Sequence, residues 1–87
     1  MTVLDVRREG EWKSGHLPGS LNVPVESLEE RVQEVPRGRP VIVHCQTGAR
    51  AAIGASLLRV RGFADVRYFP GGLAEWRAAG MPEKTSP

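Results

Sequence analysis

Three short apolar runs in the chain have the length and composition of buried β-strands. They cover residues 3–6, residues 41–43 running into His44, and residues 66–69. Their apolar character is continuous rather than alternating, which favours parallel strands that are covered on both faces. A shorter stretch, residues 20–23, is a candidate fourth strand that ends at Pro24.

Helical patterns lie between these strands. Ser27, followed three residues later by Glu30, has the spacing of a capping box, in which each side chain bonds an unpaired backbone N–H at the start of a helix. We therefore expect a helix that begins near Ser27 and ends before Pro36. Its apolar residues recur at helical spacing, at Leu28, Val32 and Val35.

The clearest helical pattern covers residues 50–61. The segment is rich in alanine and leucine, which favour helices. Ile53, Leu57 and Val60 share one apolar face of this predicted helix. Gly62 is placed to close it in the left-handed backbone conformation.

A last short helix is predicted over residues 73–79, where Leu73 and Trp76 are the buried side chains and Gly80 ends the helix. Residues 83–87 have nothing to bury and are expected to form a frayed tail. Strands that alternate with helices predict an α/β domain, with a small parallel sheet of about four to five strands flanked by helices. We expect one such domain, over residues 1–82.

Composition and charge narrow the function classes. The chain has 87 residues, 40% hydrophobic and 25% charged, as a single soluble globular domain would. Its net charge of +2 comes without a clustered basic face, which argues against nucleic-acid binding. No apolar run approaches the roughly 18–20 residues of a membrane span, and no signal-peptide core is recognised at the N-terminus. A single cysteine fits a reducing cytoplasm.

The candidate chemistry lies at Cys45. A buried strand delivers this residue to the carboxyl edge of the sheet, where open α/β folds place their ligands. The loop of Gln46, Thr47, Gly48, Ala49 and Arg50 then turns into the clearest helix, so backbone N–H groups can point at the sulfur. Arg50 adds a full positive charge, and each of these features favours a thiolate over a thiol.

A thiolate in an anion-binding loop attacks electrophilic sulfur, phosphorus or arsenic, and these residues alone do not choose among them. A lone cysteine can also be an inert core residue. His44, on the same strand, is expected to face away from Cys45 as a hydrogen-bonded structural histidine. Asp5 and Arg7 are interpreted as an ion pair or as a cap for the backbone, and residues 71–72 as a tight turn beside the site.

Across nearly its whole length the chain resembles a single-domain rhodanese, a thiosulfate sulfurtransferase-like protein. Four segments in the family's order carry the resemblance: residues 4–7 (LDVR), 12–24 (WKSGHLPGSLNVP), 45–50 (CQTGAR), and 71–76 (GGLAEW) followed by 79–82 (AGMP). A rhodanese-like chain that starts almost directly at its first strand is either a minimal version of the domain or part of something larger.

The resemblance implies a sulfurtransferase in which Cys45 carries a sulfane sulfur as a persulfide. The donor would be thiosulfate or another persulfide, and the acceptor would be cyanide, a thiol or a sulfur-accepting protein. The loop residues Gln46, Thr47, Gly48, Ala49 and Arg50 would bind the substrate, and neither a metal nor an organic cofactor would be needed.

Two alternatives to a sulfurtransferase remain open. Cysteine-dependent phosphatases and arsenate reductases of similar topology place five residues between cysteine and arginine, whereas only four separate Cys45 from Arg50. A non-catalytic rhodanese-like interaction module is the second alternative, and retention of the cysteine argues against it.

The chain departs from the thiosulfate-using pattern of the family at the mouth of the predicted site. Gln46 and Thr47 stand where well-known thiosulfate enzymes carry basic residues, and Glu11 precedes Trp12 where an arginine can occur. Because thiosulfate is a dianion, we expect it to be a donor with a high KM.

Overall fold

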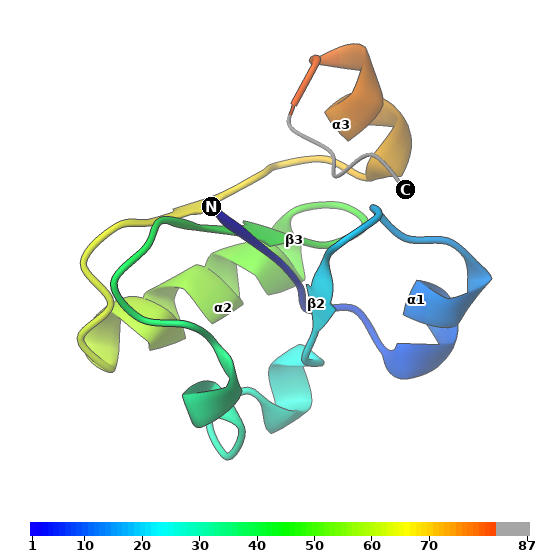
Figure 1. Cartoon of the computed structure of the whole chain (residues 1–87). Coiled ribbons are helices and arrows are strands. Elements are labelled where there is room, and N and C mark those ends of the chain that lie inside the picture. Colours follow the sequence, from blue (N-terminus) through cyan, green and yellow to red (C-terminus); the bar gives the residue numbers. More distant parts are fainter. Residues whose placement is uncertain (82–87) are drawn as a thin grey trace.

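A four-stranded parallel sheet forms the centre of the fold in the computed structural model, which describes residues 1–81 (Figure 1). The strand order is β2-β1-β3-β4 and every pairing is parallel. This confirms the predicted α/β class and the four predicted strands, with ends shifted by about a residue. The strands are β1 (Thr2–Asp5), β2 (Leu21–Asn22), β3 (Val41–His44) and β4 (Val66–Tyr68).

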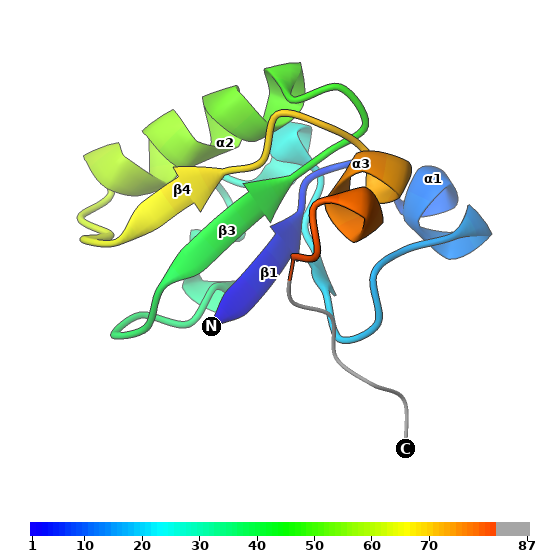
Figure 2. The same ribbon diagram turned by 90° about the horizontal axis from the view of Figure 1, so that it is seen from above.

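The strand order reverses between β1 and β3, since the chain first runs outward to β2 and then crosses to the other side of β1. The carboxyl end of β3 therefore lies at the switch point, where α/β folds bind their ligands. The loop after β3 and the helices α1 (Glu9–Ser14) and α3 (Leu73–Ala78) gather at this edge (Figures 1 and 2).

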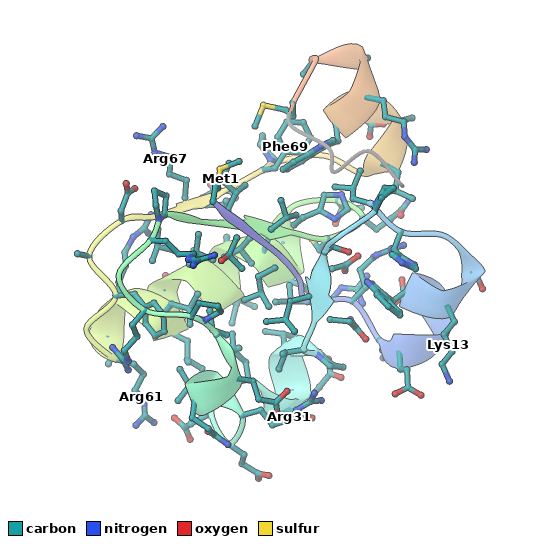
Figure 3. All side chains as sticks on the ribbon, viewed as in Figure 1. Met1, Lys13, Arg31, Arg61, Arg67 and Phe69 are labelled. Atoms are coloured by element: carbon teal, nitrogen blue, oxygen red, sulfur yellow. The ribbon has the colours of Figure 1, made fainter. Side chains whose placement is uncertain are left out.

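Each face of the sheet has its own apolar core. The helix α2 (Ala49–Val60) packs against β3 and β4 on one face, together with Leu28 and Val35. On the other face, Trp76 of α3 is fully buried in a smaller cluster. Phe69 lies on this second face, between the sheet and α3 (Figure 3), with its ring 5.1 Å from that of Trp76.

Alternation along β3 assigns its side chains to the two cores. Val43 and Cys45 belong to the core beneath α2, whereas Ile42 belongs to the core beneath α3. His44 also contacts the second core, since its ring meets Trp76 edge-on with centroids 5.5 Å apart. The whole strand is buried, as the continuous apolar run predicts.

The predicted helix over 50–61 is confirmed as α2, but of its expected apolar face only Leu57 packs against the core. Ile53 is 60% exposed and Val60 83% exposed. A Cβ on Gly54 would lie only 3.3 Å from Val43 Cγ1, so the helix approaches the sheet too closely for a large residue at that point. Small residues therefore dominate the buried face, which consists of Ala51, Gly54, Ala55 and Leu58.

The helix expected from the capping-box spacing at Ser27 is also wrong. Two short 3₁₀ turns, η1 (Val25–Ser27) and η2 (Val32–Glu34), occupy this segment. The backbone breaks between them at Arg31, with φ −110° and ψ 16°. Leu28 and Val35 are both buried against α2, so tertiary packing of these two side chains overrides the local helical preference.

Two further helices, α3 and α1, can be compared with the elements that the sequence predicts. The helix predicted over 73–79 is confirmed as α3, with Trp76 buried and Gly80 in the left-handed region at φ +67°. No local pattern predicts α1, a six-residue helix in which Glu11 accepts a hydrogen bond from the Arg8 amide at 3.1 Å. The expected frayed tail, residues 83–87, lies outside the described residues.

Candidate active site

Cys45 immediately follows β3, and its sulfur accepts backbone hydrogen bonds from the turn that begins α2. The Gly48 amide donates to Sγ at 3.0 Å and the Ala51 amide at 3.4 Å. In the described part of the chain these are the two amides that reach the sulfur, so the loop directs fewer donors inward than a full ring would. Ala51 lies one residue beyond the predicted loop, which ends at Arg50. Both amides belong to the positive end of α2, which favours a negative charge on the sulfur.

Gly48 is required at its position for two independent reasons. Its backbone is left-handed, with φ +98° and ψ −19°, a region that other residues adopt at a cost. A Cβ at this position would also lie 2.9 Å from Pro70 Cα. This conformation aims the Gly48 amide at Sγ, so the geometry of the donor depends on the absence of a side chain.

The turn before α3 lies directly against the cysteine loop. A Cβ on Gly72 would come within 2.8 Å of the Gln46 carbonyl oxygen, and the Gln46 side chain lies close by. The Gly72 amide donates to Glu75 Oε1 at 3.1 Å, which holds the start of α3 in place. The expectation of a tight turn beside the site is confirmed.

Cys45 itself is fully buried, although the loop that follows it is not. Gln46, Thr47 and Ala49 are exposed, whereas Gly48 is buried. The sulfur therefore lies just beneath an exposed loop and also contacts the core under α2. Cys45 has no exposed surface, so some of the atoms that cover it must move before a donor can reach Sγ, and burial by itself is also typical of an inert core cysteine.

Arg50 does not offer a free positive charge to the loop, because it forms a bidentate ion pair with Glu11 of α1. Nη1 lies 2.7 Å from Oε1, and Nη2 lies 3.1 Å from Oε2. The hydrogen bonds from Arg50 lower the pKa of Glu11 to about 2, against a weaker effect of burial. The same pairing raises the pKa of Arg50 above its ordinary value. Sequence reasoning noticed Glu11 only as a position that lacks an arginine, since nothing local links residues 39 positions apart.

Asp5 and Arg7 form the predicted ion pair, and it is buried. The Arg7 guanidinium donates to both oxygens of Asp5 at 2.9–3.1 Å and to the Gly15 carbonyl at 2.7 Å. Burial would raise the pKa of Asp5, but the adjacent His44 ring and the Arg7 hydrogen bonds together lower it. This pair fixes the end of β1 next to the site.

The expectation of a hydrogen-bonded His44 is wrong. Neither ring nitrogen has a hydrogen-bond partner among residues 1–81, and Asp5 Oδ2 lies 3.8 Å from Nδ1, beyond hydrogen-bond distance. The ring faces Trp76 on the second core, and the Asp5 carboxylate is already held by Arg7. His44 is thus a buried packing residue.

Among residues 1–81, no group of three or more histidine, cysteine, aspartate or glutamate side chains is arranged to hold a metal ion. Within the same residues, no helix has the length and apolar character needed to cross a bilayer.

Comparisons with known proteins agree on one family. Residues 1–79 match the rhodanese-like domain. A crystal structure of the rhodanese-like domain from an Anabaena protein superimposes with a TM-score of 0.83 at 32% identity, covering 98% of this chain and 99% of that one. A sulfurtransferase from Allochromatium vinosum is 30% identical over 92% of this chain and 75% of its own length.

Another relative is a longer protein that contains a segment similar to this chain. An HTH-type transcriptional regulator from Mycobacterium tuberculosis is 33% identical over 84 residues, or 94% of this chain. The chain spans 37% of the length of that regulator.

Proposed function

The chain belongs to the rhodanese-like domain family, and we propose that it is a sulfurtransferase in which Cys45 carries a sulfane sulfur. The observation that carries the proposal is the position of the Cys45 sulfur, 3.0 Å from the Gly48 amide at the positive end of α2. Relatives named sulfurtransferases support the reaction class. The chemistry uses no metal or organic cofactor, and an unpaired cysteine suits a reducing cytoplasm.

The first half-reaction loads the cysteine. The Cys45 thiolate attacks the outer sulfur of the donor, and a new S–S bond forms as the donor's own S–S bond breaks. With thiosulfate the leaving group is sulfite, which departs with the bonding electron pair. The negative charge then lies on the outer sulfur of the Cys45 persulfide, one bond beyond the Sγ atom to which the Gly48 and Ala51 amides donate, and the positive end of α2 favours it there.

The second half-reaction unloads it. An acceptor such as cyanide, a thiol or a cysteine of another protein attacks the outer sulfur of the persulfide. The S–S bond breaks, and its electron pair returns to Cys45 as the thiolate. Because the cysteine is itself the nucleophile in the loading step, no separate general base is required once it is ionised.

Intact mass spectrometry tests the proposal directly. We expect incubation with thiosulfate or a small organic persulfide to add the mass of one sulfur atom to the protein, and cyanide to remove it with release of thiocyanate. Cys45→Ser is the matched control, since the chain has no other cysteine. Absence of the adduct with both donors would refute the proposal.

The same protein sample distinguishes a sulfurtransferase from a cysteine-dependent phosphatase, the alternative enzyme class. An aryl phosphate supplied under identical conditions should not be hydrolysed. Turnover of that phosphate, abolished by Cys45→Ser and accompanied by no sulfur adduct, would favour a phosphatase instead.

A further inference from the structure

We propose that Glu11 determines donor selectivity: by binding Arg50 it cancels the positive charge of the cysteine loop, and the site thereby favours organic persulfides of low charge over dianions such as thiosulfate. The inference rests on the proposed sulfurtransferase function and specifies its substrate class. It concerns a residue that neither supplies the nucleophile nor donates to it.

The charge balance of the loop follows from its composition and one contact. Between Cys45 and Arg50 the residues are uncharged, so Arg50 carries the whole formal charge of the loop. Both oxygens of Glu11 accept from its guanidinium, at 2.7 and 3.1 Å. The ionised cysteine would then leave this group of residues with a net negative charge, which repels a dianion about twice as strongly as a monoanion.

Glu11 is held in place by more than Arg50. Its Oε1 also accepts from the Arg8 amide at 3.1 Å, which caps α1. The second guanidinium whose charge acts on Glu11, that of Arg7, is buried against Asp5. The carboxylate is therefore fixed beside the loop, and its pKa of about 2 keeps it ionised across the whole pH range of an enzyme assay.

Solvent reaches the pair, as a selectivity device requires. The side chains of Arg50 and Glu11 are 29% and 37% exposed. Arg50 ends the loop after Cys45, and Gln46, Thr47 and Ala49 of that loop are exposed as well, so the charge of the pair acts on a donor that approaches the loop. An unpaired Arg50 at this position would carry a charge of +1 and attract anions, whereas the ion pair of Arg50 with Glu11 has no net charge.

A donor of low charge completes the transfer with balanced chemistry. The Cys45 thiolate attacks the outer sulfur of an organic hydropersulfide, and the donor's S–S bond breaks. The departing thiolate keeps the bonding pair and then takes the proton from the more acidic Cys45 hydropersulfide. The products are the Cys45 persulfide anion and a neutral thiol.

The test measures kcat/KM for thiosulfate and for an alkyl hydropersulfide in wild type, Glu11→Gln and Glu9→Gln, with the hydropersulfide value referred to the concentration of its uncharged, protonated form. Glu9 is the matched control, since it lies on the same helix and pairs with Lys13 rather than Arg50. We expect Glu11→Gln to raise kcat/KM for thiosulfate by about tenfold and to leave the hydropersulfide value nearly unchanged. Glu9→Gln should move the ratio of the two values by less than about twofold.

A purely structural role of the ion pair predicts a different result, since a loosened loop would slow both donors alike. An unchanged ratio in Glu11→Gln would overturn the inference, provided that wild type forms the persulfide with both donors. A wild type that accepts neither donor would instead refute the proposed function. Should Glu11→Gln fail to fold, Arg50→Gln and the double variant Glu11→Gln/Arg50→Gln give the same decision. Arg50→Gln leaves the Glu11 carboxylate without a countercharge and should selectively reduce thiosulfate turnover, whereas the double variant has no net charge at the pair and should restore the wild-type ratio. A double variant with the same ratio as Arg50→Gln would overturn the inference.

Discussion

Substitution of Gly48 by alanine tests whether the cysteine loop is held as the structure shows. Two separate costs apply at this position. The residue has φ +98°, which costs an L-amino acid about 1–2 kcal/mol. The added Cβ would also lie 2.9 Å from Pro70 Cα, and relieving such an overlap costs about 1–3 kcal/mol.

Together these costs give an expected loss of about 2–5 kcal/mol in the free energy of unfolding. A domain of 87 residues has a total stability of roughly 4–13 kcal/mol, so the loss is a large share of it. Two further glycines separate the costs. Gly38→Ala carries the backbone cost alone, since φ is +83° and nothing lies within 4 Å of its added Cβ. Gly72→Ala carries the overlap alone, against the Gln46 carbonyl oxygen at 2.8 Å and with φ −95°.

Urea titration followed by tryptophan fluorescence or circular dichroism gives the three free energies of unfolding. We expect Gly48→Ala to lose more stability than Gly38→Ala. Its folded fraction should also form the Cys45 persulfide more slowly, because relief of the overlap turns the amide away from Sγ. Equal losses for Gly48→Ala and Gly38→Ala would show that the contact with Pro70 is absent, and the account of the loop would then fail.

Three further predictions concern charge. Gln46→Arg should lower the KM for thiosulfate, because it adds a positive charge that Glu11 does not neutralise; an unchanged or higher KM in steady-state kinetics would contradict this. The ion pair of Glu11 should stabilise the fold by roughly 0.5–1 kcal/mol, since solvent screens it. The pKa of Glu11 falls from its ordinary 4.5 to about 2, so this contribution is present above pH 4.5 and is lost as the pH falls toward 2. The stability difference between wild type and Glu11→Gln, measured by denaturation at several pH values, should follow that course, and a difference that does not depend on pH would argue against the pair. Asp5→Asn leaves the Arg7 guanidinium buried without a countercharge and should cost about 3–5 kcal/mol in urea titration; a loss below about 1 kcal/mol would mean that water reaches Arg7.

The strands and the position of Cys45 were predictable because they depend on local patterns. The continuous apolar run at residues 41–43 requires cover on both faces, and the structure buries every residue of β3. Glycine at 48, directly before a strong helix, likewise indicated a turn that other residues resist. These signals lie within a few residues of the feature that they predict.

The errors share a different physical origin. Ile53 is more hydrophobic than Ala51 or Gly54, yet the close approach of α2 to the sheet selects the small residues for its buried face. The capping-box spacing at Ser27 falls at the end of η1 rather than at the start of a helix, and the burial of Leu28 that follows it depends on contacts with distant segments. In both cases the decisive energy is a contact with a distant segment, which no local pattern reports.

The same distinction divides the chemistry of the candidate site. The hydrogen bonds to Sγ come from residues within six positions of Cys45, so a local segment of seven residues contains both donors. The net charge beside Cys45 depends on Glu11 of α1, which lies 2.7 Å from the Arg50 guanidinium although 39 positions separate the two residues. Chains with identical cysteine loops can therefore differ in donor preference, and the residue that faces the loop arginine is the position at which to look for that difference.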